Sequence, residues 1–255
     1  MYQHRETLSE LESNFLSMPQ HIPSARDLVR EALQRNPNLD INSLHSATYG
    51  LMMEYKSKYY ESKVDVFLSR FDLTDLPSNI RRKLKEKMLE PVVAEGVEYS
   101  NFMEEASRRI SQSFQPISGK IAELCVQREL TRVGLIEENH FTIRERRTDI
   151  TVYYPNVRSF QAKHRVEIKN VSLRERAARG LIFDGDSLFG FFNDVGEFTR
   201  SNVEVIDDLC QRTNGYCYLP PQTFDRMPYK GRRFRPNTVF GRDMASFSGT
   251  GRITT

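Results

Sequence analysis

Residues 165–176 read RVEIKNVSLRER, and they decide how the second half of the chain is interpreted. The first part of this stretch alternates apolar and polar side chains, which is typical of a β-strand. In a strand, Glu167 and Lys169 project from one side while Val166 and Ile168 face the core. We therefore expect a carboxylate and an ammonium group on the same side of this strand.

The segment upstream contains a second predicted strand and a helix. Residues 148–155 read TDITVYYP, an alternating run that stops at a proline, and Asp149 stands at its start. Residues 118–135 read SGKIAELCVQRELTRVGL, which predicts a long helix ended by Gly134. A short helix is expected after the strand that carries Lys169. The order helix, strand, strand, helix predicts an α/β or α+β core.

The N-terminal part of the chain has a helical pattern. Capping signals precede apolar-periodic runs at Ser24 and Ser78, and the run LHSATYGLMMEYKSKYYESK has apolar side chains at helical spacing. We therefore expect a helical N-terminal subdomain over residues 1–115 and the α/β core over residues 116–255. The methionine and aromatic stripes of the helical part are interpreted as helix-packing core.

The two predicted strands bring charged residues together if they pair. Asp149 then stands beside Glu167, with Lys169 on the same side. Two such carboxylates suit Mg²⁺, which takes hard oxygen ligands and keeps waters. The metal lowers the pKa of a bound water and offsets charge on a phosphodiester under attack, while the lysine orients the water and the phosphate. The alternative interpretation is a pair of strands with solvated surface charges.

Glu123 on the predicted helix is a third candidate catalytic carboxylate. It shares a helix face with Val126 and Leu130, so part of its surroundings is apolar. A carboxylate in such surroundings needs a partner or a metal-bound water. The alternative is an ordinary salt bridge with Lys120 or Arg128.

The triplet Arg174-Glu175-Arg176 allows two interpretations. Ser172 and Glu175 have the spacing of a capping box, in which Glu175 is structural and the arginines are solvated. In the competing interpretation, the arginines pair bidentately with guanine and the carboxylate accepts from the cytosine amino group in the major groove. A second triplet, at 144–146, precedes a strand and is interpreted as an exposed edge or a phosphate contact.

Composition argues against several classes of protein. No apolar run reaches about 18 residues and the N-terminus lacks the apolar region of a signal peptide, so we expect a cytoplasmic protein without membrane contact. The three cysteines lack metal-ligand spacing, which argues against a zinc site. The net charge is only +3, but residues 226–255 carry seven Lys/Arg against one acid. This segment is either a stripe that tracks phosphates or a loosely ordered basic tail.

Taken together, these residues resemble type II restriction endonucleases of the PD-(D/E)XK superfamily, and most of all the branch that recognises CCGG or CCNGG cores. In that branch a Ser-Gly helix carrying a Glu, a strand Asp and a strand Lys are followed by S-x-R-(D/E)-R. The corresponding residues here are Ser118-Gly119 with Glu123, Asp149, Lys169, and Ser172-Leu173-Arg174-Glu175-Arg176. The sequence departs from the pattern at Thr148, where proline is common, and has one extra residue between Lys169 and the triplet.

The resemblance implies a restriction-endonuclease-like core, with a mixed β-sheet flanked by helices, behind a helical subdomain that serves DNA binding or dimerisation. It implies Mg²⁺-dependent cleavage of double-stranded DNA at a palindromic site in a prokaryotic cytoplasm, leaving 5′-phosphates. A two-fold homodimer would read that site. Many members of the branch lack an acid two positions before the lysine and take a carboxylate from the helix after the triplet instead. This sequence keeps Glu167 and also offers Asp184 or Asp186 as a further metal-binding acid.

The same resemblance assigns DNA contacts to Ser172, Arg174, Glu175 and Arg176. Two alternatives remain open at this point. One is a PD-(D/E)XK nuclease of DNA repair or junction resolution, which shares the metal site but not the reading triplet. The other is a non-enzymatic helical DNA-binding module whose acids are surface charge.

Overall fold

The computed structural model of the chain describes residues 22–68, 91–94, 97–99, 102–144, 148–170 and 187–253. The described part forms two compact units, one from residues 50–117 and one from Ala25–Tyr49 with Ser118–Thr255. Outside the described residues lie several predicted features: Ser172 and the triplet 174–176, the acids Asp184 and Asp186, and the helix expected after Ser78. The assignment of DNA binding or dimerisation to residues 1–115 and of catalysis to residues 116–255 stays a prediction.

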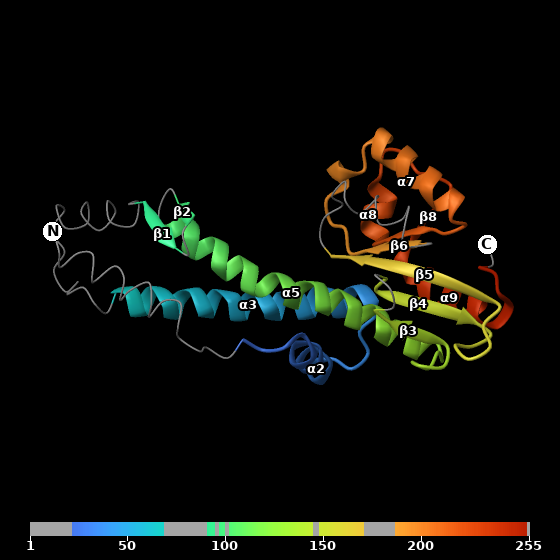
Figure 1. Cartoon of the computed structure of the whole chain (residues 1–255), viewed down its shortest axis with the longest axis horizontal. Coiled ribbons are helices and arrows are strands. Elements are labelled where there is room, and N and C mark those ends of the chain that lie inside the picture. Colours follow the sequence, from blue (N-terminus) through green and yellow to red (C-terminus); the bar gives the residue numbers. More distant parts are fainter. Residues whose placement is uncertain are drawn as a thin grey trace. The chain divides into compact units, whose positions relative to one another are not determined.

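The first unit combines helices with a small hairpin. It contains the later part of α3 (Ile41–Leu68), the strands β1 (Val92–Ala94) and β2 (Val97–Tyr99), and the first part of α5 (Phe102–Arg132) (Figure 1). The two strands pair antiparallel, with Val93 opposite Glu98. The expectation of helices alone missed this hairpin, because a three-residue strand is too short to show a two-residue period.

Helix α5 continues without a break through Pro116. A proline removes one backbone hydrogen bond from a helix interior, and the composition of the chain changes after Pro116. Both features favoured a boundary between two parts of the chain at this proline. The helix instead runs on to Arg132, and it buries Phe114 just before the proline and Ile121 just after it. Gly134 follows the helix with a φ of +87°, the left-handed conformation expected of a glycine at this position.

The second unit is built around a six-stranded sheet in the order β3-β4-β5-β6-β7-β8. Its strands are β3 (Phe141–Ile143), β4 (Ile150–Tyr154), β5 (Ala162–Lys169), β6 (Ser187–Gly190), β7 (Cys217–Leu219) and β8 (Phe234–Pro236). The first three are antiparallel neighbours and β5 to β8 run parallel. Parallel neighbours need crossover connections, which α7 (Arg200–Arg212) and α8 (Pro221–Arg226) provide after β6 and β7. The mixed α/β core expected from the sequence is confirmed.

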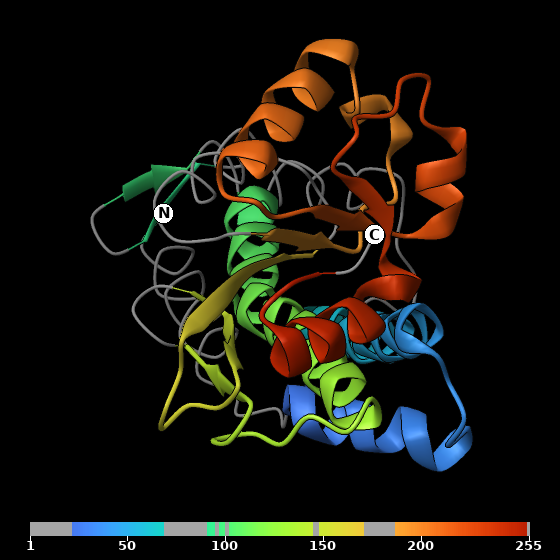
Figure 2. The ribbon, with the colours of Figure 1, turned by 90° about the vertical axis from the view of Figure 1, so that its right-hand side faces the viewer.

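Helices cover both faces of this sheet (Figure 2). On one face, Leu188 and Leu219 belong to a buried apolar cluster that includes residues of α7. On the other, the rings of Phe189 and Tyr218 contact Phe240 of α9 (Phe240–Thr250), with centroids 4.8 and 5.1 Å apart. Successive strand residues alternate faces, so β6 and β7 are buried on both sides and their apolar runs are continuous.

Most of the basic C-terminal segment belongs to the folded core. Arg235 of β8 donates a hydrogen bond to the buried carboxylate of Asp243 in α9 at 2.5 Å, and the Tyr218 hydroxyl donates to the same oxygen at 2.9 Å. α9 itself packs against β4. The interpretation of this segment as a loosely ordered tail is therefore wrong, because Phe234 and Phe240 are core residues.

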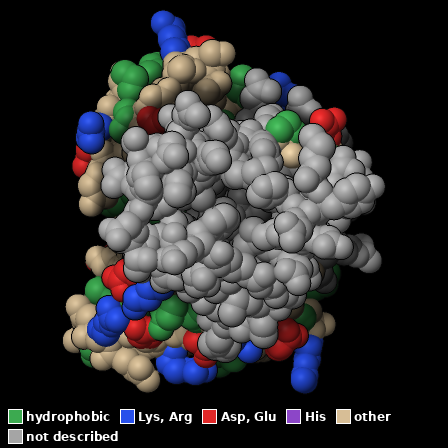
Figure 3. Space-filling model, turned by 90° about the vertical axis from the view of Figure 1, so that its left-hand side faces the viewer, with side chains coloured by type: hydrophobic (Ala, Val, Ile, Leu, Met, Phe, Trp, Pro, Cys, Tyr) green, Lys and Arg blue, Asp and Glu red, His purple; other side chains and the backbone are tan. Residues whose placement is uncertain are grey.

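The described surface mixes charges of both signs. Acidic and basic side chains stand next to one another along the lower margin of the face in Figure 3. Helix α2 (Ala25–Arg35), which begins directly after Ser24 as expected, carries the pairs Arg30–Asp27 and Arg35–Glu31 at 3.1 and 2.7 Å. Within the described ranges, every helix is too short or too polar to cross a membrane.

Candidate active site at the end of β4 and β5

The pairing of β4 with β5 sets Asp149 opposite Glu167. Ile150 is the antiparallel partner of Val166, and continuing the register by one residue brings these two acids face to face. The Oδ2 atom of Asp149 accepts a hydrogen bond from the backbone N–H of Ile168 at 2.6 Å. This bond holds the Asp149 carboxylate against the neighbouring strand.

Lys169 completes the group. Its Nζ atom donates to Oε1 of Glu167, as expected for residues two apart on one face of a strand. The lysine side chain is 31% exposed and the glutamate side chain 14%, so the lysine is the more accessible member of the pair. Val166 and Ile168 are buried, as predicted. Asp149, Glu167 and Lys169 therefore lie together at one end of the β4–β5 pair.

Glu123 approaches the same group from α5. Its carboxylate accepts from Lys120 at 2.7 Å and from Arg144 at 3.3 Å, and its side chain is 12% exposed. The salt bridge with Lys120 is thus formed, whereas Arg128 instead donates to the backbone carbonyl of Leu39. The charge of Glu123 also acts on Asp149, which places it at the edge of the acidic group.

The environment of Asp149 disfavours its charge. Burial raises the pKa of this carboxyl from 3.8 to about 6, and the negative charge of Glu167 acts in the same direction. The hydrogen bond from Ile168 and the charge of Lys169 lower the pKa but do not compensate. A raised pKa at a cluster of acids is typical of a functional site, because burial and like charges shift pKa values most often at such sites.

The donor set suits Mg²⁺. Among the described residues, no three histidine, cysteine, aspartate or glutamate side chains form a ready-made metal site. Mg²⁺ does not require one, since it is commonly held by one or two carboxylates and fills its other positions with waters and substrate phosphate oxygens. Asp149 and Glu167 offer two adjacent carboxylates whose mutual repulsion a divalent cation would relieve.

Asp149 is expected to make stability depend on pH in the absence of divalent cations. With its pKa raised from 3.8 to about 6, the folded state binds more protons than the unfolded state between about pH 4 and pH 6. The contribution of Asp149 to stability therefore falls as the pH rises through this window. Above it, Asp149→Asn should raise the free energy of unfolding by about 1–3 kcal/mol, since one pKa unit corresponds to about 1.4 kcal/mol.

Urea denaturation in EDTA measures this effect. Asparagine keeps an acceptor for the Ile168 N–H, so the substitution removes the charge and little else. The variant should be more stable than the original protein at pH 8, and the difference should shrink towards zero near pH 4. If the variant and the original protein were equally stable at pH 8, the Asp149 charge would not destabilise the folded state.

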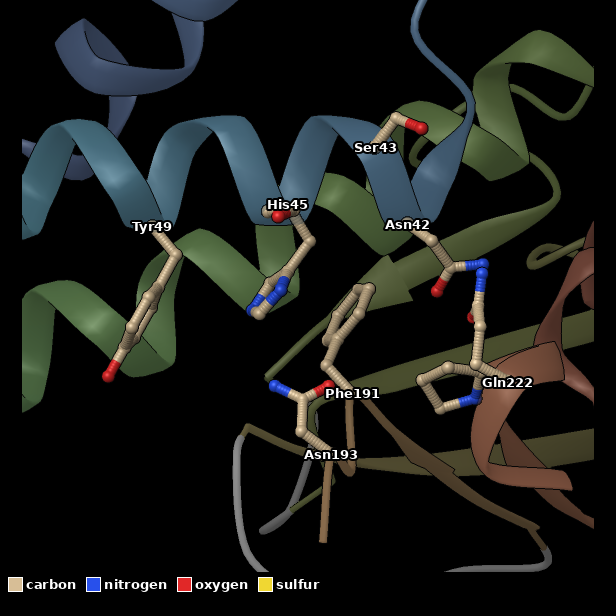
Figure 4. A pocket seen from close by; sticks show the side chains of 9 residues that line it. Asn42, Ser43, His45, Tyr49, Phe191, Asn193 and Gln222 are labelled. Atoms are coloured by element: carbon tan, nitrogen blue, oxygen red, sulfur yellow. The ribbon is translucent and has the colours of Figure 1, made fainter. Parts of the chain in front are cut away.

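A pocket of about 360 Å³ opens near the start of α3 (Figure 4). Its lining is aromatic and polar, from Asn42, Ser43, His45, Ser46, Tyr49, Phe191, Asn193, Pro220 and Gln222. The His45 ring lies flat on the Phe191 ring, with centroids 3.7 Å apart and planes 4° from parallel. Burial lowers the pKa of His45 to about 4, so its imidazole is neutral at physiological pH.

Sequence reasoning missed the neighbours of this histidine. His45 belongs to a run that reads as ordinary amphipathic helix, and Asn170 directly follows the candidate catalytic lysine. In the structure, the Nε2 atom of His45 lies 2.8 Å from Oδ1 of Asn170, although the two residues are 125 positions apart. Only the position of Asn170 next to Lys169 offered a signal in the sequence.

The six-stranded mixed sheet with helices on both faces matches a restriction-endonuclease-like fold. Among solved structures, the chain is similar to Ecl18kI. A structure described as metal-depleted Ecl18kI in complex with uncleaved, modified DNA has a TM-score of 0.66 at 12% identity, covering 94% of this chain and 84% of that chain. A second, described as metal-depleted Ecl18kI in complex with uncleaved DNA, has a TM-score of 0.61 at 12% identity, covering 96% and 84%. No protein-family model and no curated protein sequence matches the chain.

Proposed function

We propose that the protein is a type II restriction endonuclease that cleaves double-stranded DNA with Mg²⁺ and leaves 5′-phosphates. The observation that carries this proposal is the meeting of Asp149, Glu167 and Lys169 at one end of a strand pair in a restriction-endonuclease-like fold. The similarity to Ecl18kI, which was solved bound to DNA and described as metal-depleted, supports it.

In the proposed mechanism, Asp149 and Glu167 would hold the metal ion. When bound, Mg²⁺ supplies an activated water and neutralises charge on the phosphate. The ammonium group of Lys169, whose side chain is 31% exposed, would orient the attacking water and contact the scissile phosphate. Glu123 holds the Lys120 ammonium group and adds negative charge beside Asp149.

Recognition is assigned to the segment after Lys169. Arg174, Glu175 and Arg176 would contact guanine and cytosine edges in the major groove, and Ser172 would begin their helix. The site is proposed to be palindromic with a CCGG-like or CCNGG-like core, read by a homodimer in a prokaryotic cytoplasm. Asp184 is proposed as an additional metal ligand. Because Lys169 and the triplet are close in sequence, base recognition would be coupled to DNA cleavage.

Digestion of plasmid and bacteriophage DNA tests this proposal. With Mg²⁺ we expect discrete fragments that disappear with EDTA, because cleavage needs both the metal and a specific site. Sequencing the fragment ends should return one palindromic motif with a C·G-rich core and 5′-phosphates. Gel filtration with multi-angle light scattering should give twice the chain mass.

The other outcomes of the digestion are equally informative. A smear, or cleavage confined to branched or flapped DNA, would contradict restriction and favour a repair or junction nuclease with the same metal site. Binding to DNA with no Mg²⁺-dependent nicking of any substrate would contradict the nuclease assignment and favour a non-enzymatic binding module.

A further inference from the structure

Lys169 lies where the strand ladder ends. Its pairing with Gly190 is the last registered pair between β5 and β6, so regular strand pairing fixes the backbone on one side of the lysine only. Strand ends fray unless other contacts hold them. The lysine side chain is also long, with several rotatable bonds to restrain.

The residues after the ladder supply such contacts. Beyond the last pair, the backbone N–H of Phe191 donates to the carbonyl oxygen of Lys169 at 3.3 Å. Asn170 then reaches in two directions: its Oδ1 atom lies 2.8 Å from Nε2 of His45 in α3, and its Nδ2 group donates to Oγ of Ser118 in α5. Three segments distant in sequence thus meet at the residue that follows Lys169.

The orientation of the Asn170 amide is linked to the proton position on His45. In the orientation in which the amide nitrogen donates to Ser118, the amide oxygen faces the imidazole, and Nε2 then carries the proton and donates it to that oxygen. The His45 ring lies flat against the Phe191 ring (Figure 4). Phe191 is also the residue whose backbone N–H donates to the carbonyl oxygen of Lys169. Lys169, Asn170, His45 and Phe191 therefore form a closed loop of contacts.

We propose that Asn170 is a positioning residue for Lys169: its bonds to His45 and Ser118 hold the end of β5 so that the lysine ammonium group stays beside Glu167. The inference rests on the proposed nuclease function, in which Lys169 contacts the phosphate. The His45 side chain is only 5% exposed and its Nε2 atom contacts Asn170, so we assign it a role through Asn170. A displacement of about 1 Å of a catalytic group can cost about 100-fold in rate.

Substitution of Asn170 by alanine tests the proposal, with Asn156→Ala as the matched control. Asn156 lies two residues after the end of β4, whereas Asn170 directly follows β5. The Asn156 side chain also accepts hydrogen bonds, but from the nearby residues Arg158 and Ser159. We expect Asn170→Ala to lower kcat about 10–100-fold with KM for the DNA within about twofold. The control should keep both constants. Ser118→Ala, which removes one hydroxyl only, should lower kcat in the same direction by a smaller factor.

A spectroscopic readout separates positioning from a general loss of structure. Long-range ¹H–¹⁵N correlation spectra should show His45 protonated at Nε2 in the original protein and in Asn156→Ala. In Asn170→Ala the acceptor for that proton is gone, so we expect a mixture of Nε2–H and Nδ1–H tautomers. If Asn170→Ala fails to fold, the kcat of Ser118→Ala decides the question.

The outcomes distinguish this inference from the function on which it rests. If the original protein cuts DNA and Lys169→Ala does not, yet Asn170→Ala cuts within twofold of the original, the positioning role is refuted and the nuclease stands. Unchanged kcat in Ser118→Ala, where Asn170→Ala does not fold, refutes it as well. If the original protein cleaves no DNA with Mg²⁺, both proposals fall.

Discussion

Lys169→Ala is expected to reduce DNA cleavage by a factor on the order of 10³, while binding to the specific site survives. The lysine would supply a positive charge where charge develops on the phosphate, and its loss removes the cation that bonds Glu167 and lowers the pKa of Asp149. A preorganised positive charge stabilises the transition state more than the bound substrate, so loss of the Lys169 charge should lower kcat. Single-turnover cleavage of a DNA duplex containing the mapped site measures it.

Lys163→Ala is the matched control for this experiment. Lys163 is an exposed lysine on the same strand, so its removal changes the net charge equally without touching the acidic group. We expect its cleavage rate to stay within about twofold, and electrophoretic mobility shifts in EDTA should show similar DNA affinities for both variants. A Lys169→Ala protein that cuts as fast as Lys163→Ala would remove Lys169 from the mechanism.

Asp243→Ala is expected to lower the free energy of unfolding by about 3–5 kcal/mol, because it leaves the largely covered charge of Arg235 without the buried carboxylate that pairs with it. The Asp243 side chain is 1% exposed and the Arg235 side chain 16%, so water replaces little of the lost contact. The same change takes the acceptor from the buried hydroxyl of Tyr218. Urea denaturation followed by far-UV circular dichroism measures the loss.

An exposed ion pair of similar length provides the comparison. Arg212 and Asp208 of α7 are 2.6 Å apart, but their side chains are 71% and 56% exposed. Asp208→Ala should therefore cost less than about 1 kcal/mol, since solvent screens such pairs. If Asp243→Ala and Asp208→Ala destabilised the protein equally, burial would not explain the contribution of the Arg235–Asp243 pair to stability.

Local patterns in the sequence were sufficient for the strands at the site. Alternation over residues 148–155 and 164–169 predicted β4 and β5, and a two-residue period necessarily sets Glu167 and Lys169 on one face. The mixed α/β core followed from the order of these elements. The three-residue strands of the hairpin β1–β2 and the continuation of α5 through Pro116 were not predictable in this way, because neither has a local period that distinguishes it from its alternatives.

The sequence by itself thus determined which side chains share a face of β5, because that depends only on the geometry of one strand. Tertiary structure alone decided what surrounds them. The pairing register brought Asp149 opposite Glu167, and burial raised the pKa of Asp149. Packing of α3 and α5 against the end of β5 joined His45 and Ser118 to Asn170, across 125 and 52 positions. Contacts over such separations depend on how the whole chain packs, and no local pattern encodes them.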